Sequence, residues 1–460
     1  MRSFTRLCLI VAAALFCGSV IFSSADTARA AIFNPETFTL NNGMQVVVVS
    51  NHRVPVVTHM VWYKVGAMDE PPGKSGLAHY FEHLMFKGTD TLKPGEFSKI
   101  VAENGGRENA FTAQDYTGYY QSVAVDRLEL MMKIEANRMT RLALTEDVIK
   151  PERQVILEER SSRTDNNPAA QLSEQTATAL FMNHPYRIPV IGWSHEIEAL
   201  TLDDLTTFYR QWYRPNNAIL VVSGDVTAAQ VRPLAEKYYG VIPAKPLPAR
   251  VNWKEPPLLT DRRITLTHAR VRQPAWSRRF PAPSARYGDA TLAYPLQVLA
   301  EILSGGATSR LYKSLVVDDK IAASAGAWYD DHARGPGVFG FYASPAPGGG
   351  KDAASDVTEG VERAMIAQLD KLITGGVTDG EVEKAINRLQ ASAIYARDSY
   401  RTPARILGGA LAIGLSVEDV EAWPERIGAV TTADVNKAVD AIFKDRRSIT
   451  TLLLPKRKSK

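Results

Sequence analysis

Cysteine is nearly absent from this chain of 460 residues. The sequence has two cysteines, Cys8 and Cys17, and both lie within the first thirty residues. The remainder of the chain therefore contains no thiol that could form a disulfide or supply a thiolate ligand to a metal.

Long apolar runs and an excess of one charge sign are also missing beyond residue 30. No later run is long enough to span a bilayer. The 54 basic and 50 acidic residues are well mixed and give a formal net charge of +4, so nothing indicates a nucleic-acid-binding surface. The apolar fraction of 45% and the charged fraction of 23% are those of an ordinary globular protein, and the length predicts two or three domains.

The first thirty residues have the pattern of a secretory signal peptide. Arg2 and Arg6 precede an uncharged, largely apolar run over residues 7–22, and Ala28-Arg29-Ala30 is a small-x-small cleavage site. We expect residues 1–30 to be removed, the mature chain to start at Ala31, and the protein to be periplasmic or secreted in a bacterium. Because the apolar run is long for a signal peptide, an uncleaved membrane anchor is the alternative.

The stretch His79-Tyr80-Phe81-Glu82-His83 carries the most chemical information. On a helix, two histidines four residues apart project from one face. Two neutral imidazoles and one carboxylate from elsewhere would leave a zinc ion one open coordination position, as in catalytic rather than structural zinc sites. Glu82 is close enough in sequence to reach a water bound there. Alternatively, two histidines at this spacing form an ordinary polar helix face.

A third ligand is expected from the segment 151–160, Pro-Glu-Arg-Gln-Val-Ile-Leu-Glu-Glu-Arg. Glu152 and Glu159 are seven residues apart and share a helix face, whereas Glu158 points about 100° away from Glu159. Taken alone, the segment could equally be a solvated acidic helix.

Together these motifs resemble the inverted zincins, or pitrilysin-type metallopeptidases. The resemblance extends over nearly all of the chain after residue 31. It includes four further segments: Glu103–Thr112 with Asp115 and Tyr119, the helix that carries Glu152 and Glu159, Ser223-Gly224-Asp225, and Gly305–Leu311.

The resemblance implies one zinc ion per chain, bound by His79, His83 and Glu159. It implies that Glu82 is the general base and that Glu152 supports a ligand or the base. It also implies that a substrate peptide adds as a strand along Asn109-Ala110-Phe111. Asn109 could instead satisfy a neighbouring turn, and we expect His184 to be a surface histidine.

The mature chain reads as two homologous halves of α+β class, each with a mainly antiparallel sheet covered by helices. Leu200-Thr201-x-x-Asp204, followed by a strand near residues 218–220, recurs 230 residues later as Val430-Thr431-x-x-Asp434 and a strand near 448–450. We expect a zinc-binding domain over 31–242, a proline-rich linker over 243–259, and a domain without metal over 260–460. We also expect a hairpin turn at Asn42-Gly43 and long helices over 126–142 and 146–163. The resemblance implies that both halves form one side of a clamshell around the substrate.

The second half lacks the side chains that the family uses to hold substrate. The resemblance implies an arginine and a tyrosine seven residues apart after a Ser-Arg-Leu segment, but these positions are Val316 and Ala323 here. If Glu301 is aligned with Glu82, Val298 and Ile302 take the positions of the histidines. We therefore expect an endopeptidase subunit that pairs with a related chain supplying the arginine and tyrosine. Another residue of the same chain could fill that role, and the alternative function is a catalytically silent structural subunit.

Overall fold

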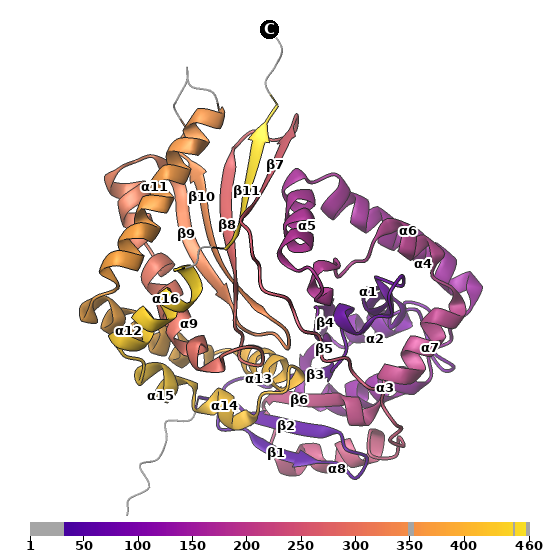
Figure 1. Ribbon diagram of the computed structural model, residues 1–460. Coiled ribbons are helices and arrows are strands. Elements are labelled where there is room, and N and C mark those ends of the chain that lie inside the picture. Colours follow the sequence, from indigo (N-terminus) through magenta and orange to yellow (C-terminus); the bar gives the residue numbers. More distant parts are fainter. Residues whose placement is uncertain (1–31, 348–353, 445–446, 457–460) are drawn as a thin grey trace, which may run out of the picture. The chain divides into compact units, whose positions relative to one another are not determined.

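The computed structural model describes residues 32–347, 354–444 and 447–456. The predicted signal peptide and its cleavage site lie outside the described residues. Residues 32–460 form one compact unit, in which two sheets carry helices (Figure 1).

The first sheet has the strand order β1-β2-β6-β3-β5-β4. Its strands are β1 (Glu36–Thr39), β2 (Gln45–Ser50), β3 (Val56–Tyr63), β4 (Arg107–Thr112), β5 (Thr117–Ala124) and β6 (Ala218–Gly224). Only β2 and β6 run parallel. The predicted hairpin is confirmed, since β1 pairs with β2 across a turn in which Gly43 has a φ of +86°.

The valine run in β2 is explained by burial on both faces of the sheet. Val46 and Val48 pack into the core beneath the helices of the first half, whereas Val47 and Val49 face a second apolar cluster. That second cluster contains residues of α13 (Thr402–Ala412). A strand buried on both faces loses the alternation of polar and apolar residues that a half-exposed strand shows.

Eight helices accompany the first sheet in the described residues. They are α1 (Leu77–Leu84), α2 (Glu96–Glu103), α3 (Leu128–Thr140), α4 (Glu146–Arg160), α5 (Pro168–Leu180), α6 (Ser194–Ala199), α7 (Leu202–Trp212) and α8 (Ala228–Tyr238). The two long predicted helices are present with small changes. The first is shorter at both ends, and α4 continues beyond Arg160 as a π-helical turn over Ser161–Asp165.

The second sheet repeats the order of the first. Its order is β7-β11-β8-β10-β9, with strands β7 (Arg262–His268), β8 (Ala275–Ala282), β9 (Ala322–Asp330), β10 (Gly337–Pro345) and β11 (Ile449–Pro455). Strand by strand, this matches β2-β6-β3-β5-β4, and the single parallel pair falls at the same place. The helices of this half are α9 (Ala293–Ser304), α10 (Arg310–Tyr312), α11 (Ala354–Gly375), α12 (Asp379–Ala396), α13, α14 (Val417–Glu421), α15 (Trp423–Gly428) and α16 (Thr432–Phe443).

The repeat predicted from sequence is visible in the capping of two helices. Thr201 and Asp204 form a capping box at the start of α7, and Thr431 and Asp434 form the same arrangement at the start of α16. Helix α7 is followed by β6, and α16 is followed by β11. These two strands occupy the same position in the strand orders of the two sheets. Between the halves, residues 243–259 contain no helix or strand.

A buried ion cluster joins the two halves close to the hairpin formed by β4 and β5. Arg334, between β9 and β10, donates from Nη2 to Asp69 at 2.7 Å and from Nε to Asp115 at 3.0 Å. Both carboxylate side chains are only 4% exposed. The turn between β4 and β5 is therefore fixed to the second half by ion pairs that are largely buried.

None of the described helices combines the length and apolar character needed to cross a membrane.

Candidate metal site

Helix α1 is short, and its start is fixed by the side chain of Glu70. The Glu70 carboxylate accepts the backbone N–H groups of Gly76 at 2.9 Å and Ala78 at 2.7 Å. Gly76 has a φ of +91°, and a Cβ there would lie 2.8 Å from the carbonyl oxygen of Ile191. Glycine is therefore required at this entry, and the carboxylate supplies the cap that the glycine cannot.

From α1, His79 and His83 project on one face with ring centroids 4.9 Å apart. Helix α4 crosses nearby and brings Glu159 to both rings. The Oε2 atom of Glu159 lies 3.1 Å from Nε2 of His83 and 3.7 Å from Nε2 of His79. These three residues can place one ligand atom each within 4.8 Å of one another.

That spacing suits a tetrahedral metal ion. Zinc–ligand bonds of about 2.0–2.1 Å at tetrahedral angles put neighbouring ligand atoms about 3.3 Å apart. The two nitrogen–oxygen distances fall on either side of this value. Two imidazoles and one carboxylate are also the donor set of catalytic zinc sites, which keep a fourth position open.

The protonation of His79 fits the same role. Burial, with smaller contributions from the charges of His83 and Arg163, lowers the pKa of His79 to about 3. The ring is therefore neutral at pH 7, which is the form that binds a cation. Its Nδ1 atom is buried and has no hydrogen-bond partner among the described residues.

His83 is oriented by Glu152, which is 5% exposed. The Nδ1 atom of His83 lies 2.8 Å from Oε1 of Glu152, and Nζ of Lys87 lies 2.5 Å from Oε2. Burial alone would lower the pKa of His83, but the hydrogen bond and the charges of nearby carboxylates, Glu152 first, raise it overall. With the Nδ1–H donated to Glu152, the lone pair of Nε2 faces Glu159 and His79.

Glu82 lies between the two histidines and reaches toward β4. Thr112, the last residue of β4, donates from Oγ1 to Oε2 of Glu82 at 2.6 Å. Burial raises the pKa of Glu82, and the hydrogen bond from Thr112 works in the opposite direction. The carboxylate is thus linked directly to the strand on which a peptide is expected to lie.

The predicted substrate strand is at an edge of the sheet. Strand β4 pairs with β5 alone, so its other side carries no strand of the described chain. Asn109 is exposed, and its Oδ1 accepts the N–H of Ala110 at 2.9 Å. Phe111, two residues further along the same face of the strand, packs against Trp62 with ring centroids 5.0 Å apart. The free edge is what strand addition requires, and the roles of these three residues remain predictions.

The positions that the family resemblance assigns to an arginine and a tyrosine lie around β9. Val316 is in the π-helical turn Lys313–Asp318 and packs against the core of the second half. Ala323 is exposed on β9, which is the edge strand of its sheet. Arg310 is engaged elsewhere, because it holds Glu381 and the carbonyl oxygen of Gly376.

The helix of the second half that corresponds to α1 is α9, which follows β8 as α1 follows β3. Val298 and Ile302 are 0% and 3% exposed in the core. Glu301 forms an ion pair with Arg388 at 2.7 Å.

The surface position predicted for His184 is wrong. The residue is 1% exposed, packed against Phe181 and Tyr186, and its backbone N–H donates to Glu255 at 2.6 Å. The following Pro185 looked like the start of an exposed loop, but Glu255 from the proline-rich segment covers it.

Sequence reasoning did not identify Thr112, Lys87 or Arg163 as parts of the site. Arg163 lies one helical turn after Glu159, and its Nη1 atom is 2.5 Å from Oε1 of Glu159. The sequence held a weak signal for Thr112, since it ends the strand in which the substrate residues lie. Lys87 and Arg163 gave none, because lysines and arginines at helical spacing usually face solvent.

Comparisons with known proteins agree with this geometry. Residues 45–193 match the family described as insulinase (peptidase family M16), and residues 199–389 match the peptidase M16 inactive domain. The chain is 32% identical over 425 residues to the zinc protease PqqE of Helicobacter pylori, covering 91% of this chain and 93% of that protein.

Solved structures show the same fold. The crystal structure of a protease from Helicobacter pylori matches with a TM-score of 0.83 and 31% identity, over 92% of this chain and 99% of that one. The periplasmic protease PqqL from Escherichia coli matches in fold with a TM-score of 0.76 and 18% identity, over 91% of this chain and 47% of that one. The two family matches, the extent of the likeness and the cluster of His79, His83 and Glu159 establish that the chain belongs to the insulinase family of peptidases, M16.

Proposed function

We propose that this chain is a zinc-dependent endopeptidase and the zinc-bearing subunit of a heterodimer. It hydrolyses peptides or unfolded segments inside a closed chamber formed with a related chain. The observation that carries the proposal is the convergence of two imidazoles and one carboxylate from α1 and α4 at the spacing of a tetrahedral metal site.

His79, His83 and Glu159 are proposed to bind one zinc ion per chain. A bound zinc ion supplies a Lewis acid that polarises the scissile carbonyl group and lowers the pKa of an adjacent water molecule. A second zinc site of this kind is not expected, because the matching positions in α9 are the buried Val298 and Ile302.

Glu82 is the proposed general base. It accepts a proton from the attacking water and returns it to the leaving amine. Thr112 holds the Glu82 carboxylate at 2.6 Å, and Glu152 holds His83 at 2.8 Å. Both contacts limit rotation of the side chain that they support.

The peptide is proposed to lie in extended form along Asn109, Ala110 and Phe111. An edge strand offers backbone N–H and C=O groups to an incoming strand, so recognition depends on extended conformation more than on side chains. This favours peptides and unfolded segments over folded proteins.

The heterodimer follows from the side chains of Val316 and Ala323, neither of which donates a hydrogen bond. A related subunit is proposed to supply the arginine and tyrosine that hold substrate and stabilise the developing oxyanion. By fold, this chain covers 47% of the PqqL chain of Escherichia coli, which is long enough for a second unit of similar size, and this accords with a site completed by a second chain. We place the protein in the periplasm, on the pattern of residues 1–30.

Metal content and activity test the proposal separately. The purified mature chain should contain zinc, and His83→Ala should lose it, whereas Glu82→Gln should keep it. Glu158→Gln is a matched control for Glu159→Gln, because Glu158 is the neighbouring exposed carboxylate on the same helix. Zinc retained equally in both glutamine variants would overturn the ligand set.

Hydrolysis of a quenched fluorescent peptide should require both this chain and the product of a neighbouring, related gene. The Glu82→Gln variant should abolish turnover in the mixture. Activity of the purified chain alone would overturn the heterodimer. A mixture that binds zinc but hydrolyses no peptide, with wild-type chains, would support a silent structural subunit instead.

A further inference from the structure

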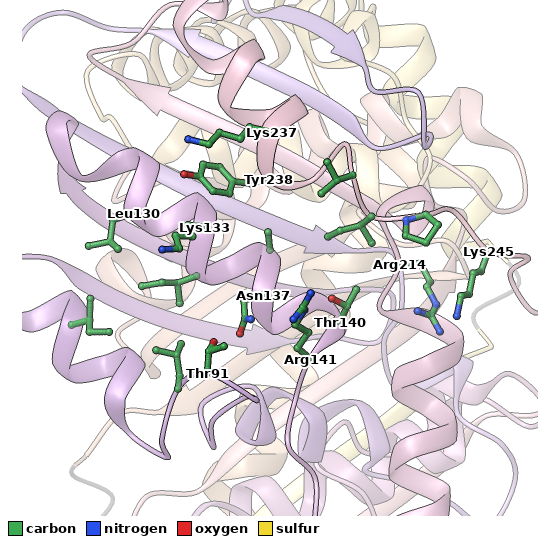
Figure 2. A pocket seen from close by; sticks show the side chains of 17 residues that line it. Thr91, Leu130, Lys133, Asn137, Thr140, Arg141, Arg214, Lys237, Tyr238 and Lys245 are labelled. Carbon is green, nitrogen blue, oxygen red and sulfur yellow. The ribbon is translucent and has the colours of Figure 1, made fainter.

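A groove with a cavity of about 830 Å³ lies on the first half, between α2, α3 and the segment that follows α8 (Figure 2). Its lining shares no residue with the candidate metal site. Cavities of this size accommodate ligands as large as a short peptide.

The charges lining this groove are all of one sign. Of its 17 lining residues none is an aspartate or a glutamate, and five are basic. The basic residues are Lys133, Arg141, Arg214, Lys237 and Lys245. They come from four separate segments of the first half, so the groove is cationic along its length. Figure 2 shows Lys133 and Lys237 toward one end and Arg214 and Lys245 toward the other.

Two of these cations form ion pairs in the described residues, and Lys133 lies near enough to Glu129 to interact with its charge without pairing with it. Arg141 pairs with Asp90 at 3.0 Å, and Lys237 pairs with Glu129 at 2.8 Å. No carboxylate of the described residues lies within ion-pair distance of Lys133, Arg214 or Lys245. The Nε atom of Arg214 is also buried without an acceptor in the described part of the chain.

The floor between these cations is apolar. Leu92 lines it from the loop before α2, Ile100 and Ile134 line it from α2 and α3, and Val241 and Ile242 line it from the segment after α8. Val241 is 75% exposed and so presents apolar surface at the rim of the groove. The groove therefore offers apolar contact and positive charge together.

The length of the groove can be estimated from how far its lining residues extend along α3. The lining residues from Leu130 to Arg141, the C-cap of α3, span twelve residues, and the eleven steps between them rise by about 16 Å. An extended peptide of about five residues has this length.

Neither end of the chain has the right charge to fill this groove. The first 31 residues contain Arg2, Arg6 and Arg29 against Asp26, and the last five are Lys-Arg-Lys-Ser-Lys. Both ends are basic and would be repelled.

We propose that this groove binds an acidic, apolar-containing peptide segment of another protein, with about three carboxylates placed among leucine- or phenylalanine-like side chains. The carboxylates complement Lys133, Arg214 and Lys245, and the apolar side chains cover the floor. The site lies outside the candidate active site, and the proposal does not depend on peptidase activity.

The test measures binding of a labelled peptide by fluorescence anisotropy. The probe is a fluorescein-labelled peptide of about seven residues that alternates Asp or Glu with Leu or Phe, and the protein is the mature chain with Glu82→Gln so that the probe survives. Lys133→Glu combined with Lys245→Glu removes two exposed cations without disturbing packing. The matched control is Lys371→Glu with Lys384→Glu, which makes the same charge change on exposed positions of α11 and α12.

The groove variant should bind the probe at least about tenfold more weakly than the parent, because each exposed ion pair contributes up to about fivefold and reversal adds repulsion. The control variant should bind like the parent, and affinity should fall as salt is raised. Thermal unfolding midpoints of both variants confirm that the fold is kept.

Equal binding by the groove variant and its control would overturn the proposal. So would equal binding of a probe with lysine in place of every acidic residue. Binding to vesicles of phosphatidylglycerol that depends on Lys133 and Lys245, without binding of the acidic peptide, would assign the groove to lipid and overturn it as well.

Discussion

Replacing Glu152 should weaken metal binding although this residue is not a proposed ligand. Its carboxylate accepts from Nδ1 of His83 and from Nζ of Lys87, and the residue is 5% exposed. In Glu152→Ala, the His83 ring loses the contact that fixes its orientation and tautomer. A hydrogen bond to a charged group contributes about 1.5–3 kcal/mol. Removal of such supporting groups costs about 10- to 100-fold in metal affinity.

The loss of zinc affinity should be smaller for Glu152→Gln than for Glu152→Ala. In Glu152→Gln, the amide oxygen still accepts from His83, but a neutral hydrogen bond is about half as strong as one to a carboxylate. We expect about a tenfold loss of zinc affinity for the glutamine variant and about 100-fold for the alanine variant, or about 1.4 and 2.7 kcal/mol.

Zinc competition against a chromophoric chelator at pH 7 measures these affinities on the isolated chain, without a partner subunit. Glu158→Gln is the matched control, since it removes an exposed carboxylate from the same helix. Thermal unfolding without zinc shows whether any loss arises from a damaged fold. Wild-type affinity in Glu152→Ala would refute the argument that His83 is positioned by this carboxylate.

Three further outcomes are expected. Thr112→Val should lower kcat of the assembled enzyme by about tenfold or more with little change in KM or zinc content, whereas Thr112→Ser should restore it, because the hydroxyl holds Glu82 at 2.6 Å. Arg334→Met should reduce the free energy of unfolding by about 3–5 kcal/mol in urea titrations, because two buried carboxylates lose their cation; a loss below 1 kcal/mol would contradict this. Burial lowers the pKa of His184 to about 4, so the unfolded chain, with a pKa near 6.5, binds more protons between these values. Stability should therefore be complete above pH 6.5 and fall toward pH 4, and His184→Gln should flatten this part of the pH profile.

The architecture could be predicted from sequence because local signals agreed with each other. The capping residues Thr201 and Thr431 marked the same helix in both halves, and Asn42-Gly43 marked a hairpin. Helix periodicity placed both histidines on one face and separated Glu159 from Glu158. Those signals act within a few residues, where propensity and capping determine the conformation.

Contacts between distant segments could not be predicted in the same way. His184 followed by proline reads as an exposed loop, but Glu255 of the proline-rich segment accepts its backbone N–H, and Tyr287 of the second half packs against its ring. Likewise, the ion cluster around Arg334 depends on two carboxylates more than 200 residues earlier. Neither contact leaves a periodic pattern, because each depends on where the chain returns after folding.

The apolar residues of α9 have an evolutionary consequence. Val298 and Ile302 are buried in the core of the second half, whereas the matching histidines of α1 form the candidate metal site with Glu159. Restoring imidazoles there would bury two polar rings without acceptors, at a cost of about 1–3 kcal/mol each. Each such substitution would lower the free energy of unfolding before a complete ligand set existed, so a metal site is costly to build in this half. Descendants of this gene can gain catalytic variety in the first half or through new partners, but hardly through the second.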